Sequence, residues 1–164
     1  MSTQADTIPR VSVPIRVVNA IMRRLLPLGV GLTPMVLLTV RGRRTGRPRT
    51  TPVGLLVHDG HRYLFSAFGE VNWVRNLRAA GVGIITRGRR RETLRAAELS
   101  AEEAGLILQS ILKSPTFGRV VRPYFPVAPD APLAAFVHEA RRHPVFELGG
   151  PAEPTSSESA SLES

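Results

Sequence analysis

The sequence predicts an α+β protein with a mostly antiparallel sheet, whose roughly six strands could close into a small barrel. Two observations lead to this fold class. β-rich runs follow one another in pairs that a short turn joins, which is typical of antiparallel hairpins. Single helices separate these pairs, and no regular alternation of strand and helix indicates a parallel sheet, which argues against a Rossmann domain. At 164 residues the chain is long enough for one domain with a hydrophobic core.

The N-terminal segment is expected to be a flexible end, residues 1–10, followed by an amphipathic helix. From residue 12 to 28, apolar side chains recur at the spacing of one helix face, and arginines occupy much of the other. Such a helix either packs on the domain or lies on an anionic membrane surface. No signal-peptide pattern is visible, and the uncharged stretch 25–40 is shorter than a membrane-spanning helix requires. We expect a cytoplasmic protein, with peripheral membrane contact as an alternative.

A buried strand, a hairpin and a short helix are expected next. The aliphatic run 36–41 predicts the strand. Residues 50–57 and 62–67 are rich in β-forming residues and enclose an Asp-Gly pair, which suits a tight hairpin turn because glycine tolerates positive φ. The helix is expected over 71–80, where a glycine follows and ends it.

A second hairpin and a capped helix follow. Strands are expected over 82–86 and 92–97, around a glycine turn. Ser100 and Glu103 have the spacing of a capping box, so a helix should begin at Ser100 and run to about Lys113.

The C-terminal part begins with a proline-rich connection. A last helix is expected over 133–143 and a closing strand over 145–148. From Gly149 the chain is rich in Ser, Glu and Pro and nearly lacks bulky apolar residues, so residues 150–164 are expected to be disordered. Residues 11–149 would then form one domain.

The charge of the chain favours anionic partners. It carries 22 basic and 13 acidic residues, a formal net charge of +9. Every basic residue except Lys113 is an arginine, which is typical of a GC-rich genome, so clustering is more informative than the total. The clusters lie at 41–49 and 87–95. The absence of cysteine excludes disulfides and thiolate metal sites.

The most unusual segment is the turn within residues 41–52. Arg43, Arg44, Arg47 and Arg49 lie within seven residues, and a guanidinium matches phosphate or carboxylate oxygens two at a time. Two glycines in the turn could let backbone N–H groups form a concave anion nest. The Gly-Lys-Ser/Thr sequence of a P-loop is not present. The pattern therefore predicts an anion site, with a solvated basic loop as the alternative.

Residues 37–52 resemble the signature of the deazaflavin-dependent nitroreductase family of actinobacteria. In that family an aliphatic strand runs into Gly-Arg-Lys/Arg-Ser/Thr-Gly-x-x-Arg-x-x-Pro, and this chain has each of these positions. The resemblance continues in shorter segments at 59–60, 73–77, 87–89 and 143–146. It covers roughly residues 15–148.

The resemblance implies a split β-barrel of the flavin-reductase-like type that binds the 8-hydroxy-5-deazaflavin coenzyme F420. This coenzyme joins an apolar ring to a phosphodiester and an oligoglutamate tail, so it is a polyanion; FMN is less favoured. The phosphate and tail would be held by Arg43, Arg44, Thr45, Gly46 and Arg49. The ring and the rest of the cofactor would be lined by Thr51, Pro52, Val53, Ser66, Ala67 and Phe68. Many relatives have lysine where this chain has Ala67.

The implied reaction is hydride transfer from the reduced coenzyme to an electron-poor small molecule, such as a quinone or a nitroaromatic compound. The cofactor carries the chemistry and the protein positions it. Tyr124, a nearby serine or solvent could deliver a proton. Trp73 either anchors its helix in the core or also contacts the cofactor. A non-catalytic deazaflavin-binding or hydrophobic-ligand-binding protein on the same fold is the alternative.

Other kinds of site are not favoured. The histidines His58, His61, His138 and His143 form no metal-binding pattern, and the spacing suggests no Ser-His-Asp arrangement. The two arginine clusters could bind nucleic acid, but aromatic residues make up only 5% of the chain and no recognition motif accompanies the charge. No nucleic-acid partner is therefore expected.

Overall fold

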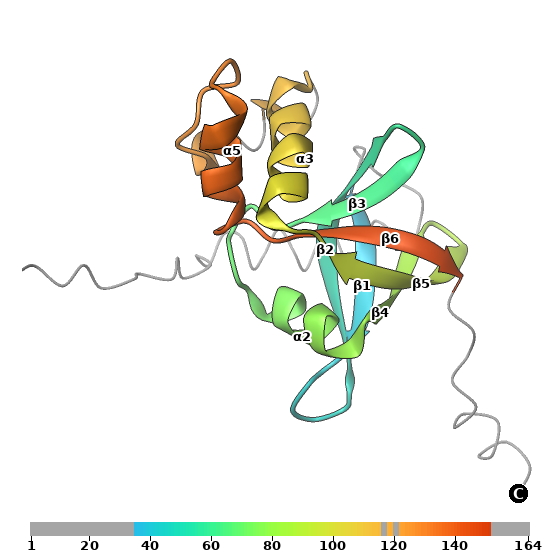
Figure 1. The fold of residues 1–164 in the computed structure, drawn as a ribbon. Helices are drawn as coiled ribbons and strands as arrows, with labels where there is room; N and C mark the ends of the chain where they lie inside the picture. The colour runs from blue at the N-terminus through green and yellow to red at the C-terminus, as the bar shows by residue number, and fades with distance from the viewer. Residues whose placement is uncertain (1–34, 116–117, 120–121, 152–164) are drawn as a thin grey trace, which may run out of the picture.

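The computed structural model of the protein describes residues 35–115, 118–119 and 122–151, so the expected helix 12–28 lies outside the described residues. Its strands form a closed antiparallel barrel in the order β1-β2-β3-β6-β5-β4 (Figure 1). The strands are β1 (Met35–Arg41), β2 (Pro48–His58), β3 (His61–Phe65), β4 (Val82–Arg87), β5 (Arg90–Glu98) and β6 (Val145–Pro151). The helices are α2 (Asn72–Ala80), α3 (Ala101–Lys113), the short 3-10 helix η2 (Arg122–Tyr124) and α5 (Leu133–Ala140). The predicted α+β barrel is confirmed.

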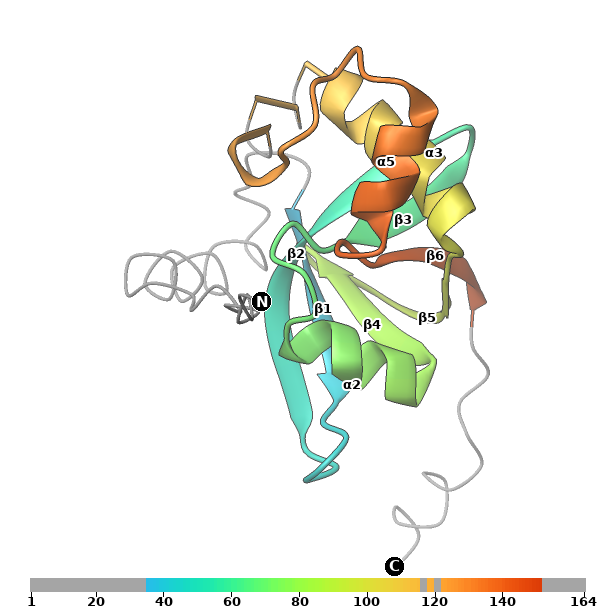
Figure 2. The ribbon, with the colours of Figure 1, turned by 60° about the vertical axis from the view of Figure 1, so that its left-hand side comes forward.

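The helices cover two different parts of the barrel. Helix α2 lies beside the turn that joins β1 to β2, whereas α3 and α5 pack against each other on the far side of the barrel (Figures 1 and 2). In the part of the chain that the structure describes, no helix is long and apolar enough to cross a membrane.

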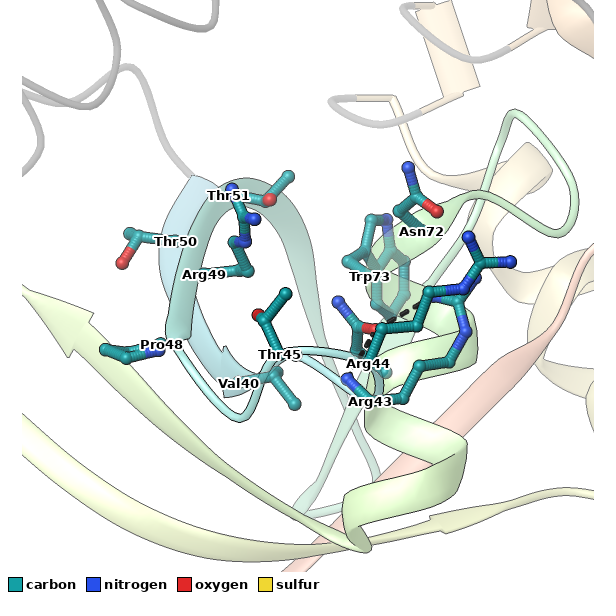
Figure 3. Close-up of a pocket in the computed structure, with 12 residues that line it drawn as sticks. Val40, Arg43, Arg44, Thr45, Pro48, Arg49, Thr50, Thr51, Asn72 and Trp73 are labelled. Carbon is teal, nitrogen blue, oxygen red and sulfur yellow. Dashed lines mark hydrogen bonds between the residues drawn. The ribbon is translucent and has the colours of Figure 1, made fainter.

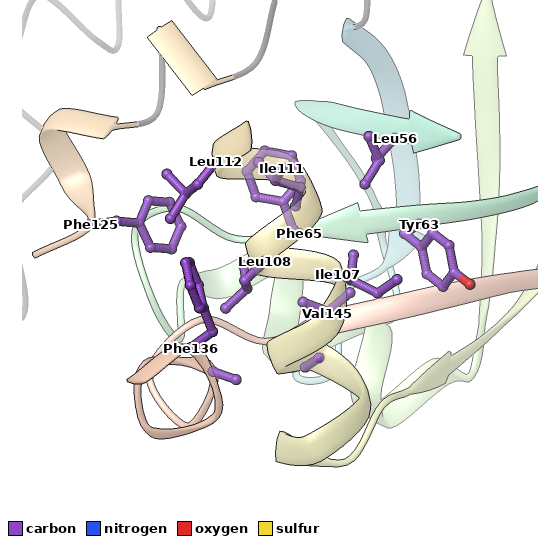
Figure 4. Close-up of a cluster of buried hydrophobic side chains, with 12 residues drawn as sticks. Leu56, Tyr63, Phe65, Ile107, Leu108, Ile111, Leu112, Phe125, Phe136 and Val145 are labelled. Atoms are coloured by element: carbon purple, nitrogen blue, oxygen red, sulfur yellow. The ribbon is translucent and has the colours of Figure 1, made fainter. Parts of the chain in front are cut away.

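The hydrophobic core consists of two clusters on opposite faces of the sheet. Leu64 points into the barrel interior with Phe146, while its neighbour Phe65 points outward, because successive side chains of a strand face opposite sides. The outward cluster packs β3 and β6 against α3 and α5, with Phe136 fully buried between them (Figure 4).

Two local sequence predictions, one hairpin turn and one helix cap, are confirmed. Asp59 and Gly60 have φ of 49° and 78°, the pair of positive values that a tight hairpin turn requires. The capping box is also confirmed: the Glu103 N–H donates to Ser100 Oγ (3.3 Å), and the Ser100 N–H donates to Glu103 Oε2 (3.0 Å).

Several expected boundaries differ from those in the structure, for different reasons. Strand β2 begins at Pro48 rather than at residue 50, because Arg41 pairs with Pro48 and shortens the turn. Helix α5 ends at Ala140 rather than at residue 143, ahead of Pro144, whose ring disfavours helical backbone in the residue before it. Strand β6 continues to Pro151, opposite Leu94, so residues 149–151 belong to the sheet and not to a tail.

Candidate functional site

The arginine-rich turn between β1 and β2 is closed by its own backbone. The Gly42 N–H donates to Arg47 O (2.9 Å), and the Gly46 N–H donates to Gly42 O (2.8 Å). Gly46 has φ of +66°, a conformation that other residues rarely adopt. The expected anion nest of glycine N–H groups is therefore wrong, since the turn uses both groups internally. An anion at this turn would have to be bound mainly by side chains.

A pocket with a volume of about 570 Å³ lies between this turn and helix α2 (Figure 3). This is within the range of cofactor and ligand sites. It is lined by Val40, Gly42, Arg43, Arg44, Thr45, Pro48, Arg49, Thr50, Thr51, Asn72, Trp73 and Asn76.

The pocket carries unbalanced positive charge. Arg43, Arg44 and Arg49 all line it, and no acidic residue does. Within the described part of the chain, the side chains of Arg44 and Arg49 form no hydrogen bond or ion pair, and the side chain of Arg43 bonds only to a neutral amide. Guanidinium groups without carboxylate partners attract a polyanion, so the charge suits the ligand that the turn predicts.

Asn76 connects α2 to the turn. Its side-chain oxygen accepts hydrogen bonds from the Arg43 backbone N–H (3.2 Å) and from Arg43 Nη1 (2.9 Å). Asn76 is only 6% exposed, so this contact orders both groups at the edge of the core. The sequence feature that could have pointed to Asn76 is the Trp-x-x-Asn spacing. This spacing puts Asn76 on the same helix face as Trp73.

The apolar wall of the pocket is formed by Trp73 and Val40. The Trp73 ring also packs against the barrel core, with its centroid 6.0 Å from that of Phe146. Trp73 therefore anchors α2 in the core and also borders the pocket, while its contact with the cofactor stays a prediction.

A second contact fixes the other end of α2. Arg78 donates to Glu98 from Nε (2.6 Å) and Nη2 (2.8 Å), and to Glu70 from Nη2 (2.9 Å). The hydrogen bonds to Glu98, despite opposing desolvation, raise the pKa of Arg78 above its ordinary value. These bonds tie α2 to β5 and hold it against the barrel.

The structure brings six of the twelve residues predicted to bind the cofactor into the pocket: Arg43, Arg44, Thr45, Arg49, Thr51 and Trp73. The other six are not part of the pocket lining. Gly46 is in the turn, Pro52 and Val53 are buried further along β2, and Ser66, Ala67 and Phe68 follow β3. The sequence did not single out five other lining residues, which are Val40, Pro48, Thr50, Asn72 and Asn76.

Tyr124 lies against Phe68. The two rings meet edge to face with centroids 4.9 Å apart, and Tyr124 is 45% exposed. The two residues, 56 positions apart in the sequence by their numbering, thus lie side by side beyond the end of β3. Tyr124 is not part of the pocket lining.

The histidines do not form a metal site. Among the residues that the structure describes, no group of three or more His, Asp, Glu or Cys could hold an ion. However, His58 lies between Ser110 (Oγ to Nδ1, 3.2 Å) and Asp59 (Oδ2 to Nε2, 3.4 Å), an arrangement that the spacing did not suggest. The side chain of Asp59 is 85% exposed, and His58 is at the opposite end of β2 from the pocket.

The fold resembles several solved structures. An F420-H2 dependent reductase (FDR-A) is 18% identical over 71% of this chain and 95% of its own, with a TM-score of 0.50. A structure described as a domain-swapped dimer is 18% identical over 83% of this chain and 99% of its own, with a TM-score of 0.51. The protein Atu2129 of Agrobacterium tumefaciens, of unknown function, is 16% identical over 89% of this chain and 58% of its own, with a TM-score of 0.53. At these identities the likeness shows the fold alone.

The comparison with protein families is more specific. No protein with a curated function matches the chain. The model of the F420H(2)-dependent quinone reductase family matches residues 14–118, which include the arginine turn, the pocket and α2. The chain therefore belongs to the F420H(2)-dependent quinone reductase family, a family of oxidoreductases whose cofactor is coenzyme F420.

Proposed function

We propose that this chain transfers hydride from reduced coenzyme F420 to a quinone, with nitroaromatic compounds as further electron acceptors. The observation that carries the proposal is the pocket between the arginine turn and α2. Its lining combines guanidinium groups that no lining carboxylate neutralises with the indole of Trp73. A ligand that joins an anionic chain to an aromatic ring would match both kinds of group.

The charged part of the coenzyme fits the donors of the turn. Arg43, Arg44 and Arg49 can each offer a planar pair of N–H groups to phosphate or glutamate oxygens. The hydroxyl of Thr45 accepts a hydrogen bond from the Arg47 N–H (3.4 Å), so its own hydrogen is free to donate. Since the glycine N–H groups are used within the turn, these side chains carry the anion contacts.

The remaining predicted residues would bind the ring and shield it. Thr51 lines the pocket on the same face of β2 as Arg49, and Pro52 and Val53 continue the strand. Ser66, Ala67 and Phe68 would close the site from the end of β3, and Gly46 shapes the turn. When bound, the reduced coenzyme supplies the hydride, and the chain orients it and excludes water.

Tyr124 is the proposed proton donor. Reduction of a quinone to a quinol requires a proton in addition to the hydride. The Tyr124 ring contacts Phe68, a residue of the proposed cofactor lining, and it is accessible to an acceptor from solvent. Replacing Tyr124 with phenylalanine keeps the ring contact and should lower kcat with little change in cofactor affinity.

The experiment that tests the acceptor class measures oxidation of reduced F420 by a panel of quinones and nitroaromatic compounds. We expect catalytic turnover with quinones and slower turnover with nitro compounds. Turnover with nitro compounds alone would contradict the quinone assignment. Tight binding of F420 without turnover of any compound in the panel would instead indicate a non-catalytic deazaflavin-binding protein.

Peripheral membrane contact is a separate proposal, which the lipophilic character of quinones supports. It concerns the basic segment 12–28, which lies outside the described residues. Co-sedimentation with phosphatidylglycerol vesicles, with and without residues 1–28, tests it. Equal vesicle binding by the full chain and by the chain without residues 1–28 would contradict this proposal.

A further inference from the structure

A buried carboxyl and imidazole pair lies at the end of α5, in a place that the proposed chemistry does not use. Glu139 is 6% exposed and His143 is 7% exposed. Glu139 Oε1 lies 3.2 Å from His143 Nε2, and the backbone oxygen of Ser66 lies 3.0 Å from His143 Nδ1. The Phe125 ring packs on the imidazole with centroids 4.2 Å apart, which shields the pair from water.

The two hydrogen bonds of His143 require a hydrogen on Nδ1 and one more between Nε2 and Glu139. A backbone oxygen can only accept, so His143 Nδ1 carries a hydrogen and donates it to Ser66. The contact between Nε2 and Glu139 then needs one further hydrogen, either on the ring as an imidazolium or on the carboxyl group. In both forms the pair holds one shared proton and leaves neither buried group unsatisfied.

The pair holds the turn that leads from β3 to α2. Besides the bond from His143, the Ser66 N–H donates to Pro144 O (3.0 Å), and Ser66 Oγ donates to Gly69 O (2.6 Å). Gly69 has φ of +73°, and a Cβ there would lie 3.2 Å from the backbone oxygen of Arg142. The turn is therefore fastened to the segment after α5 at two points.

This turn positions one wall of the pocket. The Val71 N–H donates to Gly69 O (2.9 Å), and α2 begins at the next residue. Its residues Asn72, Trp73 and Asn76 line the pocket. A continuous series of hydrogen bonds therefore connects Glu139, through His143, Ser66 and Gly69, to the start of α2.

We propose that Glu139 and His143 are positioning residues for the cofactor pocket: the buried pair fixes the turn from Ser66 to Val71 and so holds α2 opposite the arginine turn. The proposal rests on the proposed function, in which this pocket binds coenzyme F420. Neither residue lines the pocket, so each acts through Ser66. Without the pair, α2 occupies its binding position for a smaller fraction of time, and the apparent Kd rises in proportion.

Three variants separate this role from packing. His143→Phe keeps a ring against Phe125 but removes both hydrogen bonds. Glu139→Met removes only the partner of Nε2. Glu139→Gln is the conservative variant, because its amide N–H can donate to a neutral Nε2 while Nδ1 still donates to Ser66. Phe136→Leu on the same helix is the packing control, since Phe136 is 1% exposed and takes no part in the hydrogen bonds.

Two readouts are measured on the full chain. Trp73 is the single tryptophan of the sequence and lines the pocket, so its emission reports the position of α2 without any cofactor. The second readout is the Kd for F420, with thermal unfolding as the check on folding. We expect His143→Phe and Glu139→Met to raise the Kd about tenfold and to shift the Trp73 emission. Glu139→Gln should stay within about twofold of the wild type.

Folded His143→Phe or Glu139→Met protein with the wild-type emission and Kd would overturn the proposal. So would a Phe136→Leu variant that raises the Kd as much for the same loss of thermal stability. If His143→Phe does not fold, the comparison of Glu139→Met with Glu139→Gln decides. If the wild type does not bind F420, the proposed function fails, while the Trp73 emission still tests the positioning role.

Discussion

The side-chain oxygen of Asn76 on α2 accepts two hydrogen bonds from Arg43 in the β1–β2 turn, one from the backbone N–H (3.2 Å) and one from Nη1 (2.9 Å). The contact joins segments 33 residues apart and sets both the path of the turn and the direction of the guanidinium group. It leaves the charge of Arg43 unneutralised, because an amide carries no charge.

Two substitutions of Asn76 should separate geometry from charge. Asn76→Leu removes the acceptor and should weaken F420 binding about tenfold, since Arg43 loses its orientation and a hydrogen bond to a charged group is worth about 1.5–3 kcal/mol. Asn76→Asp keeps the acceptor but should also weaken binding, because it adds negative charge to the pocket. Arg75→Ala on the same helix is the control, since Arg75 is paired only distantly with Glu70 (4.0 Å). An Asn76→Asp protein with improved affinity would contradict the charge argument.

Arg44 should contribute to cofactor affinity mainly through its charge. Arg44→Ala should raise the Kd for F420 about tenfold, equivalent to about 1.4 kcal/mol, and the effect should shrink at high salt because exposed charges are screened. Arg90→Ala is a matched control: it removes the same charge from an exposed position at the start of β5. Equal losses in both variants, measured by titration at two salt concentrations, would show that only net charge matters.

Gly46 should be required for the shape of the turn. Gly46→Ala places a side chain at φ of +66° and should reduce the free energy of unfolding by about 1 kcal/mol. Gly150→Ala is the control, because its Cβ would meet nothing within 4 Å and its φ is outside the left-handed region. Thermal unfolding measures both variants, and equal stability of the two would show that the turn tolerates the change.

The capping box should make stability depend on pH. Hydrogen bonds from the Ser100 backbone and side chain lower the pKa of Glu103. A carboxyl whose pKa is lower in the folded state stabilises the fold above its unfolded pKa, and this contribution is lost as pH falls through the folded pKa. The stability difference between the wild type and Glu103→Ala should therefore be present at neutral pH and shrink in acid. A difference that stays constant down to pH values well below the ordinary carboxyl range would exclude this linkage.

The sequence was sufficient where local chemistry decides the structure. The Asp59-Gly60 turn and the Ser100 cap depend on residues at most three positions apart, so their side chains and backbone preferences determine them. The alternation of Leu64 and Phe65 likewise follows from strand geometry. The arginines of the pocket were found because they lie together in one turn.

The sequence was insufficient where distant segments meet. The bonds from Asn76 to Arg43 and from His143 to Ser66 join residues 33 and 77 positions apart, and no local pattern predicts such a pairing. The anion nest failed for a related reason: the pairing of Arg41 with Pro48 tightens the turn, which then consumes the N–H groups of its own glycines. Likewise, β6 extends to Pro151 because β5 offers a partner there, although its composition resembles a tail.

Titration of the full chain with coenzyme F420 and, in parallel, with FMN tests the central claim most directly, with the quenching of Trp73 fluorescence as the signal. Trp73 lines the pocket together with the arginines of the turn, and its ring lies close to Arg43 and Arg44 (Figure 3). We expect saturable quenching by F420, binding at least tenfold weaker for FMN, and loss of the F420 signal when Arg43 and Arg44 are both replaced by alanine. Tight binding of FMN together with no binding of F420 would contradict the account.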